Sequence, residues 1–519
     1  MHNIEAVLGL VVVAIVVAAL AGRLRTPAPS LLVLVGLGIG FIPGFSTLHV
    51  SPDLVTLGVL PPLLFSAAQQ ISLIDLRRVW VPVSALAVVL VAVTAAVVGA
   101  VTHVVDPQIS GAVAFTFGAV LASTDPVAVT ALSRELRLPA RVSTLVQAES
   151  LFNDATSLVL FEVAVAAAVC GHVDAADAVQ RFLVLAVGGI AVGIAAGILG
   201  GVSLRRAQDP IAQAALAVVT PYVAAVAAHA CHVSPVTAVI VAGLMLARRR
   251  ARSRQPEGRL LAASVYEVIV FVLENAIFAV IGLELATFIR DLPDADRAKT
   301  VALLAVVTVT LLASRALALA LPLLLKNIWT TAAGAQAWRV GAVVTWAGAR
   351  GVIPLAAALS IPTTTHSGTP FPHRSMLLVV ATGVVVITLV IQGTTLAPLV
   401  RSLGVVTRPA DSDAELARTT FALAVAGLDH LDAAAESLQV PTPLVDRLRA
   451  KLQHDADVTR SRLDDASPAA HVDAAPLRRA VLDAQAEELA RLRAAGEISA
   501  ETFRQMQRRL DAEHLHVDD

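Results

Sequence analysis

Stretches of apolar residues long enough to cross a lipid bilayer recur along most of the chain. A helix rises about 1.5 Å per residue, so crossing a hydrocarbon core of about 30 Å takes about 20 apolar residues. Thirteen windows meet or approach this length, near residues 4–22, 29–45, 54–70, 79–101, 109–133, 142–169, 182–204, 210–230, 234–247, 264–287, 299–325, 339–361 and 375–399. Only 15% of the 519 residues are charged and 56% are hydrophobic, which excludes an ordinary soluble chain. The sequence predicts an all-α polytopic membrane protein with about 13 transmembrane helices.

The basic residues predict how these spans are oriented. If the N-terminus is outside, the cytoplasmic loops carry most of them, including the pairs at 77–78 and 205–206 and the cluster at 248–254. The outer loops carry fewer, namely Arg181, Arg290, Arg297, Lys299 and Arg374. Cytoplasmic loops of membrane proteins are enriched in Lys and Arg. We therefore expect the N-terminus outside and the C-terminus in the cytoplasm.

The composition changes after residue 404. Residues 1–404 hold all the predicted spans, whereas residues 405–519 are rich in charged residues, Ala and Leu at helical spacing. This predicts a transmembrane domain followed by a helical cytoplasmic tail, which is either a solvated appendage or a regulatory or dimer-contact segment. The formal net charge of the chain is -1, so there is no electrostatic case for a nucleic-acid partner.

Two consecutive apolar windows, the fifth and the sixth, contain carboxylates that a bilayer does not tolerate without a reason. The first is the sequence STDPVAV, in which Thr124 and Asp125 precede Pro126. Proline breaks a helix, and a broken helix inside a membrane protein exposes backbone groups that bind ions. We expect Asp125 and Thr124 to line an ion site, although Asp125 as a cap of the following half-helix is the alternative.

The second acidic stretch is ESLFNDATS in the next span. Ser150, Asp154 and Ser157 lie at i, i+4 and i+7 and so share one helix face, while Glu149 and Asn153 share another. A carboxylate in a low-dielectric environment holds a proton more readily than one in water, so Asp154 can bind either a proton or a monovalent cation. Competition for one site is sufficient for exchange.

Two arginines, Arg315 and Arg350, lie within predicted spans. A guanidinium cannot be neutralised in a membrane, so each must meet an acid or carbonyl groups. We predict that Glu149 and Arg315 form a structural ion pair, and that Arg350, in the sequence GARG ahead of Pro354, lies at a second helix break. Breaks in the fifth and twelfth spans are the spacing expected of inverted repeats.

A polar stripe in the window at 264–287 has two interpretations. It contains Glu267, Glu274, Asn275 and Glu284. A stripe that faces the helix bundle is favoured over a second ion site.

The motifs STDPVAV, ESLFNDATSLVLF and WAGARGVIPLAAAL together resemble the monovalent cation:proton antiporter-1 family, the bacterial NhaP-like and sodium/hydrogen exchanger group. The resemblance covers residues 5 to 405. It implies thirteen spans with inverted repeats, a homodimer, a bacterial plasma membrane location and a mobile domain that carries the ion.

By position, the resemblance implies that Asp154 is the ion-binding and proton-carrying acid, with Asn153, Asp125, Thr124 and Ser150 around it. Glu149 and Arg315 are the stabilising pair. Asparagine at 153 is similar to members that exchange one cation per proton. The chain departs from some relatives at Ser66, where they carry an acid.

These observations predict a secondary active antiporter that exchanges Na⁺ or Li⁺ for H⁺, for pH and sodium homeostasis. We expect no cofactor and no enzymatic activity, since the sequence contains no GxxxxGK[ST], HExxH or GxSG-type motif. Potassium/proton exchange remains open as an alternative. From other classes, a cation channel and a membrane sensor remain open.

Overall fold

The structure of the protein is a computed structural model. It describes residues 2–24, 28–42, 54–125, 140–170, 175–250, 256–290, 292–325, 332–362, 364, 369–405, 409–464, 482, 484–489, 491–492 and 506. Helices make up nearly all of these residues, and the only β contact in the described part is an isolated bridge between Thr364 and Pro370. The all-α class predicted from the apolar windows is confirmed.

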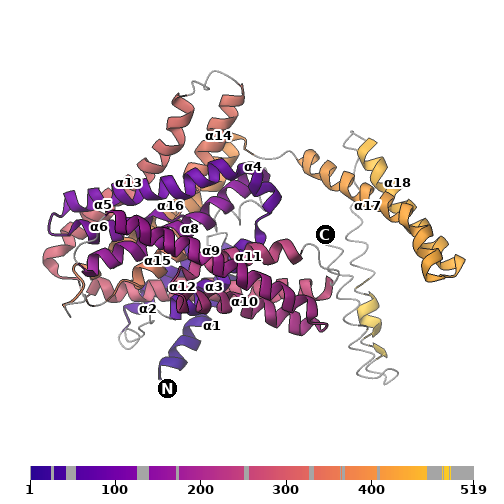
Figure 1. Ribbon diagram of the computed structural model, residues 1–519, viewed down its shortest axis with the longest axis horizontal. Coiled ribbons are helices and arrows are strands. Elements are labelled where there is room, and N and C mark those ends of the chain that lie inside the picture. Colours follow the sequence, from indigo (N-terminus) through magenta and orange to yellow (C-terminus); the bar gives the residue numbers. More distant parts are fainter. Residues whose placement is uncertain are drawn as a thin grey trace. The chain divides into compact units, whose positions relative to one another are not determined.

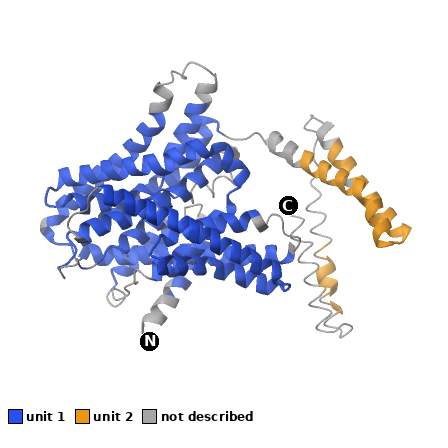
Figure 2. Cartoon of the chain, viewed as in Figure 1, with its two compact units in different colours: residues 1–407 blue, residues 408–519 orange. Residues whose placement is uncertain are grey.

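The chain divides into two compact units, Met1–Thr407 and Arg408–Asp519, which are shown in different colours in Figure 2. Within the second unit, α17 (Pro409–Leu438) and α18 (Thr442–Asp464) pack against each other. The turn between them places Gln439 at a φ of 52°. Most of the predicted helical tail after Asp464 lies outside the described residues.

The first unit is a bundle of helices that lie side by side (Figure 1). Its helices are α1 (His2–Leu24), α2 (Ala28–Gly40), α3 (Leu60–Gln70), α4 (Leu73–Ser84), α5 (Val91–Val105), α6 (Gly111–Ala122), α8 (Ala140–Cys170), α9 (Ala175–Arg206), α10 (Pro210–Ala230), α11 (Pro235–Arg250), α12 (Pro256–Arg290), α13 (Asp294–Leu325), α14 (Ala332–Trp346), α15 (Val352–Leu359) and α16 (Arg374–Leu403). Seven helical spans in the described residues are long and apolar enough to cross a membrane, and further apolar helices are shorter.

Prolines lie next to two π-helical segments of the bundle. The π-helical segment η2 (Ala85–Leu90) follows Pro82, which lies inside α4. Proline supplies no amide hydrogen, so the hydrogen-bond register changes there and a wider turn follows. A second π-helical segment, η1 (Leu54–Val59), leads into α3, whose first turn contains Pro61 and Pro62. Of these elements, α3 lines the site described below, whereas α4 and η2 contribute no residue to its lining.

The helices of the bundle form two groups. The first helix group consists of α1–α3 and α9–α12. Its most extensive contacts are those of α2 with α12 and of α9 with α11. The second helix group consists of α4–α6, α8 and α13–α16. Its most extensive contacts are those of α5 with α6 and of α6 with α8. Fewer contacts join the groups, chiefly those of α12 with α16 and of α8 with α9. The boundary between them runs through the interior of the protein.

Candidate functional site

The helix that precedes Asp125 ends in the interior of the bundle. α6 ends at Ala122, and Ser123 has extended backbone angles, with φ of -72° and ψ of 149°. Asn153 in α8 fixes this interruption, because its Oδ1 accepts a hydrogen bond from the Thr124 amide at 3.2 Å. Its Nδ2 donates to Thr124 Oγ1 at 2.6 Å. Pro126, the predicted cause of the break, and the half-helix predicted after it lie outside the described residues.

A second break faces the first. α14 ends at Trp346, residues 348–351 are not helical, and α15 begins at Val352. The amide of Asp125 donates to the carbonyl of Ala349 at 2.7 Å, so the two interrupted helices are joined at their breaks. A Cβ on Gly351 would overlap the Asp125 carboxyl group, which places that carboxyl against the start of α15. The partial positive charge of a helix N-terminus favours an anion there.

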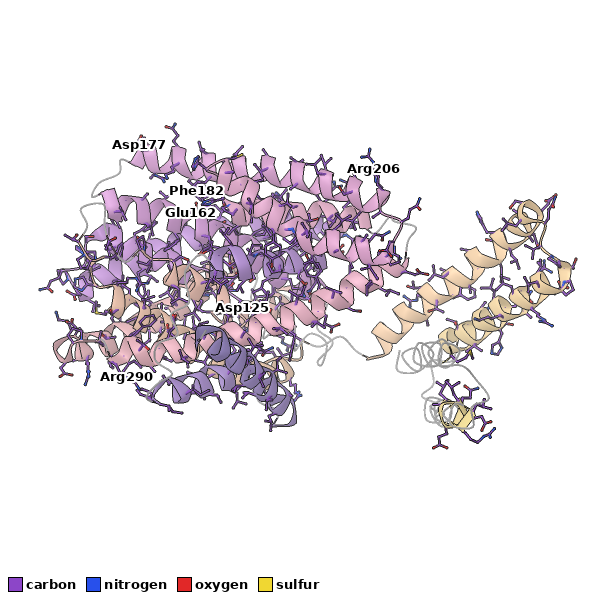
Figure 3. The ribbon with its side chains drawn as sticks, turned by 90° about the horizontal axis from the view of Figure 1, so that it is seen from below. Asp125, Glu162, Asp177, Phe182, Arg206 and Arg290 are labelled. Carbon is purple, nitrogen blue, oxygen red and sulfur yellow. The ribbon has the colours of Figure 1, made fainter. Side chains whose placement is uncertain are left out.

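A cavity of about 130 Å³ lies where the breaks meet. A cavity of this volume is large enough for a cation and a few waters. Its lining residues are Leu63, Leu64, Ser66, Ala67, Gln70, Thr124, Asp125, Gln147, Ser150, Leu151, Asp154, Val270, Glu274, Ile353 and Pro354. They come from both helix groups, so the cavity lies on the boundary between the groups. Asp125 is labelled in the interior of the bundle in Figure 3.

Asp154 is the most deeply buried acid of this lining. Its side chain is 4% exposed, and its Oδ1 atom has no hydrogen-bond partner. A buried carboxylate oxygen without a donor is costly, because ionised groups in a low-dielectric interior need a proton, a cation or a hydrogen bond. The arrangement therefore suits a group that binds and releases a small cation or a proton.

The other predicted residues divide into two sets. Thr124, Asp125 and Ser150 line the cavity with Asp154, and the Ser150 hydroxyl donates to the Thr124 carbonyl. Asn153 does not line the cavity, since both ends of its amide are bonded to Thr124. Ser157 does not line it either, although it shares a helix face with Asp154, and its hydroxyl donates to the Ala119 carbonyl at 2.8 Å.

Glu149 and Arg315 form an ion pair in the second helix group. Arg315 NH1 and NH2 bond the two carboxylate oxygens of Glu149 at 2.7 and 2.8 Å, and the exposed fractions of the two residues are 5% and 1%. Arg315 Nε and NH2 also donate to the carbonyl of Val344 at 3.2 and 3.0 Å. The pair thus joins α8, α13 and α14. It does not line the cavity.

Arg350 lies at the second break, in the position proposed for it from the sequence. Its NH1 donates to the carbonyl of Gly348 at 3.0 Å, and its amide donates to Thr388 Oγ1 at 3.1 Å. The side chain is 3% exposed and its Nε has no hydrogen-bond partner. A fixed positive charge near the break balances part of the negative charge of the two aspartates.

The interpretation of the polar stripe in α12 is wrong in part. Glu267, expected to face the bundle, is exposed, and Glu274 lines the cavity with Asp125 and Asp154. These two glutamates are seven residues apart and share a helix face, but the helices that cover this face differ along α12. Sequence spacing carried no signal that distinguishes them.

A bundle of apolar helices in which two broken helices meet beside buried carboxylates defines a membrane transporter of small cations. Comparison with known proteins agrees, since residues 10–402 match the model of the sodium/hydrogen exchanger family, transmembrane. The chain belongs to the sodium/hydrogen exchanger family, whose members are transporters that exchange cations for protons.

Relatives extend over most of the chain. An uncharacterized Na(+)/H(+) exchanger of Mycobacterium tuberculosis is 32% identical over 99% of this chain and 97% of the relative. A sodium, potassium, lithium and rubidium/H(+) antiporter of Bacillus pumilus is 31% identical over 70% of this chain and 56% of the relative. The fold is similar to that of the sodium proton antiporter MjNhaP1 from Methanocaldococcus jannaschii, with a TM-score of 0.63 and 19% identity over 78% of this chain and 99% of that one.

Proposed function

We propose that the protein exchanges Na⁺ or Li⁺ for H⁺ at the cavity, with Asp154 as the acid that carries either ion. The observation that supports this most directly is the partnerless Oδ1 of Asp154 beside the polar lining. Asp125, Thr124 and Ser150 are the proposed additional ligands of the cation. Asn153 positions Thr124 rather than touching the ion.

Exchange follows from competition at Asp154. A proton and a cation cannot both occupy a carboxylate that is surrounded by low-dielectric protein, so binding of one displaces the other. Net transport requires that the loaded site open to each side in turn, and the boundary between the two helix groups is the place where such movement needs the fewest contacts to change. The proton gradient drives the cycle and no cofactor takes part. One cation per proton makes the exchange electroneutral.

The orientation we propose places the N-terminus outside and the C-terminal unit in the cytoplasm, in the plasma membrane of a bacterium. The distribution of basic residues supports it. In Figure 3, Asp177 and Arg290 lie toward one end of the bundle and Arg206 toward the opposite end, as this orientation requires of outer and cytoplasmic loops. Labelling of single cysteines placed at 177 and 206 in intact cells tests the assignment.

We also propose a homodimer, a state that rests on the resemblance of the motifs to the antiporter family. Cross-linking in native membranes tests it, and a monomer band alone contradicts it. Potassium/proton exchange is the second candidate within transport, and the breadth of cations in the name of the Bacillus pumilus relative supports keeping it. A channel predicts flux without a proton gradient, and a sensor predicts no flux.

The test of the proposal is cation-dependent proton movement in proteoliposomes. Sodium, lithium and potassium are added in turn to vesicles with an imposed pH gradient. Sodium- or lithium-dependent dissipation of the gradient supports the proposed ions, dissipation by potassium alone supports the second candidate, and a protein that moves no protons with any of them contradicts the proposal.

A further inference from the structure

Glu274 is a carboxylate that approaches the cavity from the other side of the group boundary. Asp125 and Asp154 belong to the second helix group, whereas Glu274 lies in α12 of the first. Among the described lining residues it is the only charged side chain that the first helix group contributes. From α3 of the same helix group, Ser66 also lines the cavity, and it offers a hydroxyl and no charge.

The chemistry of the lining indicates what Glu274 faces. None of the described lining residues is basic, and Arg350, which lies outside the lining, balances only part of the negative charge of the three carboxyl groups. Carboxylates gathered at membrane depth are retained where an ion or a proton neutralises them. Asp154 in the same cavity is only 4% exposed, and its buried Oδ1 has no hydrogen-bond partner, which is an independent sign that a ligand belongs there.

We propose that Glu274 stabilises the transported cation in this cavity, supplying from the first helix group a negative charge that complements Asp154 and Asp125. This inference rests on the proposed function. At separations of a few ångströms a carboxylate attracts a monovalent cation strongly in a partly buried site, directly or through one water.

The place of Glu274 has a mechanistic consequence. Because it lies across the boundary from Asp154, its distance to the cation changes whenever the two helix groups shift. The cation is then held more tightly in the arrangement seen here than in one where the groups have moved apart. A difference in affinity between two states is what allows a ligand to bias their populations.

The experiment measures the apparent KM and maximal rate of sodium-dependent proton movement for purified full-length variants in proteoliposomes. Glu274→Gln keeps the size of the side chain and removes its charge. We expect its apparent KM for sodium to rise about tenfold, equivalent to about 1.4 kcal/mol, with a maximal rate near that of the wild type. Glu267→Gln is the matched control, since Glu267 is an exposed carboxylate of the same helix, and it should leave both parameters unchanged.

A second variant guards against misfolding. Glu274→Gln combined with Ser66→Glu returns a carboxylate to the same side of the cavity from α3, and should recover most of the lost affinity. An unchanged KM in Glu274→Gln overturns the inference, as does a KM that rises equally in Glu267→Gln. Absence of any exchange by the wild type contradicts the proposed function instead, so the two failures are distinguishable.

Discussion

At the scale of single residues, the buried ion pair of Glu149 and Arg315 is expected to contribute to the stability of the protein. Removing one partner leaves an uncompensated charge among apolar side chains, which costs about 3–5 kcal/mol. Glu149→Gln and Arg315→Leu should each lower the thermal midpoint and the yield of detergent-solubilised protein. The double exchange Glu149→Arg with Arg315→Glu should recover part of the loss.

The measurement for this pair is the melting of purified variants followed by size-exclusion fluorescence. Glu267→Gln serves as the control, because it removes an exposed carboxylate. The double exchange is compared with Glu149→Arg alone and with Arg315→Glu alone. If it is no more stable than either of these, Arg315 is not the functional partner of Glu149 and Arg350 takes that place.

Gly351 gives a second prediction at this scale. A methyl group at this position would overlap the Asp125 carboxyl group, so Gly351→Ala must displace that acid from the start of α15. We expect sodium-dependent exchange to fall at least tenfold while the protein still inserts and purifies. Gly38→Ala in α2, where a Cβ meets nothing within 4 Å, should be silent. Normal exchange by Gly351→Ala would show that the position of Asp125 is unimportant.

The sequence predicted residues of the site to the extent that helix geometry alone determines their neighbours. The i, i+4 spacing placed Ser150 beside Asp154. Few charged residues lie within the predicted spans, so the sequence also predicted that Glu149 pairs with Arg315. Glu274 was predicted only as a member of the polar stripe in 264–287, because its place in the cavity depends on which helices cover α12, a property of packing. Ser157 shares the predicted helix face with Asp154 but does not line the cavity, because a shared face extends over several turns and the cavity does not.

At the scale of elements, the two interrupted helices hold each other. The Asp125–Ala349 hydrogen bond joins the breaks, and Asn153 fixes Thr124 with two more. Each buried hydrogen bond contributes about 1 kcal/mol, and unsatisfied partners cost more. Asn153→Ala should therefore lower the thermal midpoint and raise the apparent KM for sodium several-fold.

Thr156→Val is the control for Asn153→Ala. It lies in the same helix, and its hydroxyl bonds only the carbonyl of Phe152 one turn earlier, at 3.0 Å. Melting and transport assays of the two variants side by side distinguish the loss of the two Asn153–Thr124 hydrogen bonds from a general effect on α8. Equal effects of both would contradict the role of Asn153 in positioning Thr124.

Helix breaks were predictable at the level of the span but not of the residue. Proline and glycine in GARGVIP indicated a break near Arg350, and the structure places it at 348–351. Pro354 lies in the first turn of α15, where the missing amide hydrogen costs no helical hydrogen bond. The contact between Asp125 and Ala349 joins residues far apart in the sequence, and local propensity carries no information about it.

At the scale of the whole molecule, the division into two compact units predicts that the first folds alone. The last helix of that unit, α16, closes with Gly404 in the left-handed conformation at φ of 66°, a conformation that ends a helix without strain. Truncation after Thr407 should leave the thermal midpoint of the purified protein unchanged. Aggregation of the truncated protein on size-exclusion chromatography would contradict this.

The all-helical class and the order of the apolar helices along the chain followed from length and hydropathy, because a bilayer fixes how long a span must be. Their separation into two groups did not, since every membrane helix is apolar on most faces and periodicity does not select its neighbours. The position of the cavity on the boundary between the groups is therefore knowledge that only the three-dimensional structure provides.

The central claim is that one buried carboxylate alternates between a cation and a proton. The most direct test compares wild type, Asp154→Asn and Glu267→Gln in proteoliposomes at equal protein density, with sodium, lithium and potassium added in turn to an imposed pH gradient. We predict that wild type and Glu267→Gln dissipate the gradient with sodium or lithium and that Asp154→Asn is silent with all three. Cation-dependent proton movement by folded Asp154→Asn at the wild-type rate would contradict the account.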